Sequence, residues 1–177
     1  MLLSTIYKML DYLEQWNRLE RYYKKVLDLE LNEQNLSSDE CLEEMYLFFE
    51  NCFKLRDWVR NSEYVGKKAK TEITELFEND KNLSVCAGLA NRRKHLRIDS
   101  RKRYGDSSVV SHSVTVMVPV LRIGSSRPQT SSITKAKYNW GLKSGGEKFE
   151  LIRLAKLCME EIKTFMSDHN LLSQATK

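Results

Sequence analysis

Residues 37–60 read SSDECLEEMYLFFENCFKLRDWVR, and this stretch decides the fold class. Its first four residues, Ser37 to Glu40, form a capping-box pattern, in which a serine and a glutamate three residues later satisfy free N–H groups at the start of a helix. Apolar side chains then recur at helical spacing, at Met45, Phe48, Phe49, Cys52, Leu55 and Val59. The stretch therefore predicts an amphipathic helix with one face in a core.

The same spacing predicts four more helices on either side of this one. We expect them at about residues 3–31, 63–77, 83–97 and 146–168, with a loop at 32–36, a break at 78–82 and a fraying tail after residue 171. The sequence between the fourth and the last of the five helices has a different pattern. Val114, Val116 and Val118 alternate with Ser113, Thr115 and Met117, which is the period of a half-buried strand.

A second alternating run ends at Tyr138 and Trp140, and a turn-rich loop with Gly124, Pro128 and four serines separates the two runs. Pro119 favours an edge position for the first strand. The predicted fold is a mainly α, single-domain chain over residues 1–177. It has a helical bundle over 1–99, one β-hairpin over 108–141 and a final helix over 146–168.

Composition limits the functional classes. A chain of 177 residues that is 41% hydrophobic can bury one core without disulfides or a structural metal. Cys41, Cys52, Cys86 and Cys158 lie far apart with no CxxC pair, so we expect buried, reduced thiols and a cytoplasmic protein. The apolar start meets Lys8 too soon for a signal peptide, and we expect no membrane segment and no cofactor.

The net charge of +5 and the pI near 9.0 suggest an acidic partner. Residues 86–103, CAGLANRRKHLRIDSRKR, concentrate the cations. On a helix, Asn91, Lys94 and His95 fall within one arc. Nucleic-acid contacts are predicted at the neighbouring cations, Arg92, Arg93, Arg97, Arg101, Lys102 and Arg103.

Such a face suits a polyanion, because each phosphate can form charged hydrogen bonds with several cations and the nucleic acid releases counterions on binding. Catalysis is assigned to His95, Asn91 and Lys94. An imidazole exchanges protons near neutral pH, so His95 could remove a 2′-hydroxyl proton from RNA while Lys94 stabilises a pentacovalent phosphate without any metal. The small residues Ala87, Gly88 and Ala90 would let a helix or ligand approach closely.

Three interpretations of this face stay open. In the first, Asn91 and His95 only bond to backbone groups where helices meet, and the arginines are solvated. In the second, the face contacts nucleic acid without catalysis. In the third, it cleaves RNA.

A helical bundle with a late helix of the form Asn91-x-x-Lys94-His95 resembles the HEPN (higher eukaryote and prokaryote nucleotide-binding) superfamily. The resemblance covers about residues 38–100 and the last helix. Many HEPN members are small prokaryotic ribonucleases or toxins with an Arg-X4-6-His motif. In this chain the positions of that arginine hold Gly88, Leu89 and Ala90.

The resemblance implies that His95 is the base and Asn91 its polar companion. Arg92 or Arg93 would replace the missing arginine from another helical phase. The resemblance further implies a homodimer with two such helices across one cleft, and a role in prokaryotic or phage conflict.

Other residues carry weaker signals. Asp57 could orient His95 or pair with Lys94 in a supporting role, or form a surface ion pair with Arg56 beside Trp58. His95, His112 and Asp57 could meet around a metal, but no ligand spacing supports this, and we expect no metal site. The SGGE run at 144–147 is either a plain turn into the last helix or an anion site at its N-terminus.

The hairpin mixes cations with aromatics, at Arg122, Arg127, Lys135, Lys137, Tyr138 and Trp140. These side chains could stack on bases or form a protein interface. The leading hypothesis is therefore an RNA-facing protein. The alternative is a noncatalytic interaction or regulatory module that uses the hairpin and an exposed helix face, with an apolar patch around Tyr138 and Trp140. A small-molecule enzyme would need a closed pocket that no sequence motif indicates.

Overall fold

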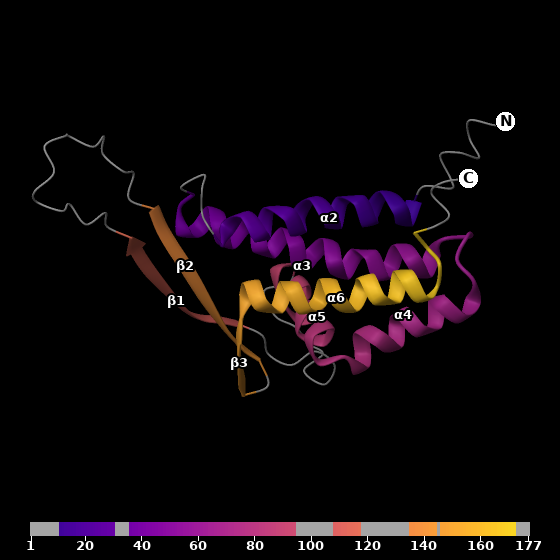
Figure 1. Ribbon diagram of the computed structural model, residues 1–177. Coiled ribbons are helices and arrows are strands. Elements are labelled where there is room, and N and C mark those ends of the chain that lie inside the picture. Colours follow the sequence, from indigo (N-terminus) through magenta and orange to yellow (C-terminus); the bar gives the residue numbers. More distant parts are fainter. Residues whose placement is uncertain (1–10, 31–35, 95–107, 118–134, 145, 173–177) are drawn as a thin grey trace, which may run out of the picture.

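The computed structural model describes residues 11–30, 36–94, 108–117, 135–144 and 146–172. In these residues the chain forms five helices and three strands (Figure 1). The helices are α2 (Asp11–Leu29), α3 (Ser38–Asn61), α4 (Lys67–Asn79), α5 (Lys81–Lys94) and α6 (Leu151–Asp168). The strands are β1 (Ser108–Met117), β2 (Lys135–Ser144) and β3 (Glu147–Glu150). The mainly helical class, with antiparallel strands before the last helix, is confirmed.

The predicted capping box opens α3. The Glu40 backbone N–H donates to Ser37 Oγ at 3.3 Å, and the Ser37 backbone N–H donates to Glu40 Oε2 at 2.8 Å. α3 is the longest described helix, and α2, α4, α5 and α6 all pack against it. The helix that the sequence identifies most clearly is therefore also the centre of the bundle.

A single residue makes the corner between α4 and α5. The Asp80 backbone N–H ends α4 by donating to Leu76 O at 2.9 Å, while Asp80 Oδ1 accepts from the Leu83 N–H at 2.8 Å at the start of α5. The predicted break at 78–82 is thus one residue long. α4 begins at Lys67, four residues later than predicted, because Ser62 already ends α3 and Gly66 caps α4.

The sheet has the order β1-β2-β3, so the prediction of a hairpin alone was incomplete. β1 and β2 are antiparallel, with Val114 opposite Tyr138, and Gly141 in β2 lies opposite Glu150 in β3. Gly146, at φ 86°, turns the chain into β3 with a backbone angle that a glycine adopts without strain.

The final helix therefore begins at Leu151 and not at residue 146. Glu150 caps it by accepting from the Ile152 and Arg153 N–H groups at 3.0 and 2.7 Å. The anion-site interpretation of residues 144–147 is wrong, because Glu147 already belongs to β3 and the Glu150 carboxylate occupies the N-terminus of α6.

One hydrophobic core joins the helices to the sheet. Trp140 and Leu142 of β2 are buried in it together with the aromatic side chains of α2 and α3, such as Trp16, Phe48 and Phe49. The strands meet the N-terminal end of α6, as Figure 1 shows. None of the described helices is long and apolar enough to cross a membrane.

Candidate functional site

Helix α5 carries the first part of the predicted basic face. From Val85 to Ala90 every residue of this helix is buried, and α5 packs against α3, α4 and α6. The small residues Ala87, Gly88 and Ala90 therefore serve helix packing and do not leave the backbone open to a ligand. Asn91 is half-buried and is the first residue beyond this buried stretch.

The cationic residues follow directly. Arg92, Arg93 and Lys94 belong to the last described turn of α5, although only their backbone is described. His95, Arg97, Arg101, Lys102 and Arg103 lie outside the described residues. The predicted convergence of Asn91, Lys94 and His95 stays a prediction.

Asp57, the predicted supporting residue, lies in α3 and pairs with its neighbour Arg56. Arg56 Nη2 and Nε donate to Asp57 Oδ1 at 2.8 and 3.1 Å, and the guanidinium carbon lies 4.0 Å from the centre of the Phe53 ring. The Arg56 side chain is 12% exposed and that of Asp57 45%. This arrangement agrees with the ion-pair interpretation, and contact with Lys94 or His95 stays untested.

The aromatic side chains of the hairpin are less exposed than the sequence suggests. Trp140 is only 2% exposed, and the half-buried Tyr138 ring lies 5.5 Å from it. Trp140 can therefore neither stack on a base nor form an exposed apolar patch, and that prediction was wrong. Arg122 and Arg127 lie outside the described residues, as do the side chains of Lys135, Lys137 and His112.

The four cysteines are free and buried, as predicted. Cys52, Cys86 and Cys158 come from α3, α5 and α6, and Cys86 Sγ donates to Phe49 O at 3.5 Å. Burial raises the pKa of the Cys86 thiol well above its usual value, and burial also raises the pKa of Cys158. These groups stay protonated at neutral pH and are not nucleophiles.

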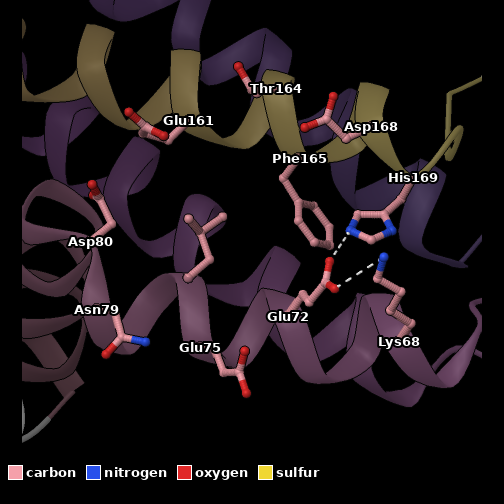
Figure 2. A pocket seen from close by; sticks show the side chains of 11 residues that line it. Lys68, Glu72, Glu75, Asn79, Asp80, Glu161, Thr164, Phe165, Asp168 and His169 are labelled. Atoms are coloured by element: carbon pink, nitrogen blue, oxygen red, sulfur yellow. Dashed lines mark ion pairs between the residues drawn. The ribbon is translucent and has the colours of Figure 1, made fainter.

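A groove that sequence reasoning missed runs between α4 and α6 (Figure 2). It has a volume of about 540 Å³. Glu72 crosses it, with Oε2 2.7 Å from His169 Nε2 and Oε1 3.6 Å from Lys68 Nζ. The His169 ring also lies 4.6 Å from that of Phe165. The spacing of Lys68 and Glu72 is visible in the sequence, but no pattern connects them to a histidine at the end of α6.

A smaller groove of about 420 Å³ lies where α3 ends and α4 begins. Arg60 and Lys70 supply its cations, and Thr71 and Thr74 line it with hydroxyl groups. Both hydroxyls donate at 3.2 Å to backbone carbonyls of α4, so their hydrogen atoms are not free for a ligand.

The described residues contain no cluster of three His, Cys, Asp or Glu side chains arranged to hold a metal ion. The chain matches no family model, no curated protein and no solved structure. A proposal about its function must therefore rest on its own charge and geometry.

Proposed function

We propose that the chain is a cytoplasmic protein that binds RNA through residues 91–103, which we call the basic segment. The observation that carries this proposal is the distribution of charge. The basic segment contains seven Lys or Arg residues and one Asp, so its net charge of +6 exceeds the +5 of the whole chain, and the remaining residues have a net charge of −1. Phosphate backbones are attracted by cations concentrated in this way.

The described part of α5 supports the proposal. This helix is buried from Val85 to Ala90, and the sequence turns from apolar to cationic directly after that stretch. The described surface also gives little support to an apolar protein interface. Among the described residues, Leu172 is the one exposed large hydrophobic side chain, at 36%. A charged partner fits this surface better than an apolar one.

The proposal includes an RNA-cleaving step. His95 takes the proton of a 2′-hydroxyl, the 2′-oxygen bonds to phosphorus, and the bond from phosphorus to the 5′-oxygen breaks. The leaving 5′-oxygen takes a proton from water, and His95 then returns its proton to the hydroxide that remains. The products are a 2′,3′-cyclic phosphate and a 5′-hydroxyl end. Lys94 stabilises the charge on phosphorus, and Asn91 orients the imidazole.

The assembly that we propose follows from the HEPN resemblance. A homodimer would place two basic segments across one cleft, as in the small prokaryotic ribonucleases and toxins of that superfamily. Native mass spectrometry of the purified chain measures this state, and a chain that stays monomeric at all concentrations contradicts the dimer.

Binding is tested by removing three cations of the basic segment together, with Arg93→Gln, Arg97→Gln and Arg101→Gln. If these residues contact phosphates, affinity for a single-stranded RNA falls. The slope of log affinity against log salt then decreases by about 2, because each lost contact removes about 0.7. The control variant, Arg21→Gln, Lys24→Gln and Arg153→Gln, removes the same charge from exposed positions of α2 and α6. An equal loss in both variants contradicts the proposal.

Cleavage is tested with total RNA, with and without a chelator, for wild type and His95→Ala. We expect wild type to cut RNA in the presence of the chelator and the variant to leave it intact. If wild type leaves RNA intact, the cleaving step is wrong. If wild type also binds RNA no better than the triple variant of the basic segment, the whole proposal is wrong.

A further inference from the structure

The groove between α4 and α6 carries negative charge on both walls, in contrast to the net positive chain. Glu75 projects from α4, and Glu161 and Asp168 from α6 (Figure 2). Within the described part of the chain, none of these three carboxylates has an ion-pair partner. We propose that this groove docks an extended, Lys- and Arg-rich segment of a partner protein.

The other two acidic side chains of the groove already have partners. Glu72 is held between His169 and Lys68, which fixes it across one end of the groove. Asp80 accepts from the Leu83 N–H and caps α5 at the other end. The carboxylates left for a ligand are therefore Glu161 and Asp168 on α6 and Glu75 on the outer edge of α4, where it also borders the smaller groove of Arg60 and Lys70.

The shape of the groove favours basic side chains over free cations. Leu76 and Phe165 give it an apolar lining between the acidic walls. Lysine and arginine match such a surface, because their aliphatic stems cover apolar atoms while their charged ends reach carboxylates. A small hydrated ion would gain nothing from that lining.

The length of the groove sets the length of the peptide that it can hold. The wall formed by α4 runs from Lys68 to Asp80, or about 18 Å at the rise of an α-helix. An extended peptide advances about 3.3 Å per residue, so about six residues span the groove. The groove lies along α6 towards His169, whereas the sheet joins α6 at the opposite end.

The experiment measures the affinity of a fluorescent hexapeptide of alternating lysine and arginine by polarisation at low salt. The groove variant combines Glu75→Gln, Glu161→Gln and Asp168→Asn. The control variant combines Glu20→Gln, Asp28→Asn and Glu63→Gln, which are exposed residues outside the groove and change the net charge equally. Circular dichroism verifies that both variants fold.

We expect wild type to bind the peptide and the groove variant to bind it about tenfold more weakly, since each exposed ion pair contributes little alone. The control variant should bind like wild type. The proposal is overturned if wild type does not bind, or if both variants weaken equally, which would show attraction to overall charge. It is also overturned if spermine binds wild type as tightly as the peptide and loses as much affinity in the groove variant, because the groove would then hold small polyamines.

Discussion

At the scale of single residues, the buried thiols give the first prediction. All four cysteines have no exposed surface, and burial raises the pKa of Cys41 from 9.0 to about 11. We expect the folded protein to react slowly with a disulfide reagent at neutral pH, because the reagent attacks thiolates. In denaturant, four thiols per chain should react at once. Rapid reaction of one thiol per folded chain, measured by absorbance, would contradict this prediction.

The raised pKa of Cys41 makes the stability of the folded chain depend on pH in the alkaline range. Well below pH 9.0 the Cys41 thiol is protonated in both the folded and the unfolded chain, so its contribution to stability is constant. As pH rises towards 11, the unfolded chain loses this proton first, and stability falls. The free energy of unfolding should therefore decrease in this range, and Cys41→Ser should reduce the decrease.

Some residue-level features could be predicted from the sequence and others could not. The burial of the four cysteines follows from their apolar helical surroundings. The contact between Gln15 and Asn51 does not, because the Gln15 amide crosses from α2 to α3 and donates to Asn51 Oδ1 and Asn51 O at 3.0 Å each. The ion pair between His169 and Glu72 could not be predicted from the sequence either. Single side-chain contacts between distant elements depend on packing that no local pattern records.

At the scale of elements, local sequence patterns predicted the ends of an element correctly where its own side chains bond to its own backbone. The cap of α3 is such a case, since Ser37 and Glu40 are three residues apart and bond to each other. The predicted start of α6 at residue 146 was wrong, because residues 147–150 form β3 by pairing with β2. Lys81 at the start of α5 also lies 5.5 Å from the Phe149 ring of β3. Contacts from distant parts of the chain thus decide the structure of residues 147–150.

The cap of α3 gives the first prediction at this scale. Ser37→Ala should lower the free energy of unfolding by about 1 kcal/mol, because the Glu40 N–H loses its acceptor. Chemical denaturation measures this loss. Ser38→Ala is the matched control, since Ser38 is the first residue inside α3 and does not supply the cap. An equal loss in the two variants would show that the cap does not stabilise the helix.

The same cap predicts a dependence on acid. The bond from the Ser37 backbone N–H lowers the pKa of Glu40 below 4.5, so the folded chain favours its carboxylate. This stabilisation is present above the unfolded pKa and is lost as pH falls through the folded pKa. Glu40→Gln should therefore lose less stability than wild type on acidification, whereas an unchanged loss would argue against the assigned bond.

At the scale of the whole molecule, the buried stretch of α5 is part of the core that the helices share. Leu89 is 1% exposed in a helix that touches α3, α4 and α6. Leu89→Ala should lower the free energy of unfolding by about 2–5 kcal/mol, because it removes buried atoms and leaves a cavity. Leu172→Ala, the same substitution at an exposed residue, should change it by less than about 0.5 kcal/mol.

The same pair of variants tests whether the chain is a single domain. When all proteins compared carry Trp16→Phe and Trp58→Phe, the buried Trp140 is the one tryptophan left and reports on the sheet by fluorescence, while circular dichroism reports on the helices. One core joins both parts, so the two signals of Leu89→Ala should change together during thermal unfolding and at a lower temperature than in wild type. A sheet signal that keeps its wild-type midpoint while the helices melt would mean that the strands fold as a separate unit. The basic segment would then connect two independent bodies, and α5 would not fix its position.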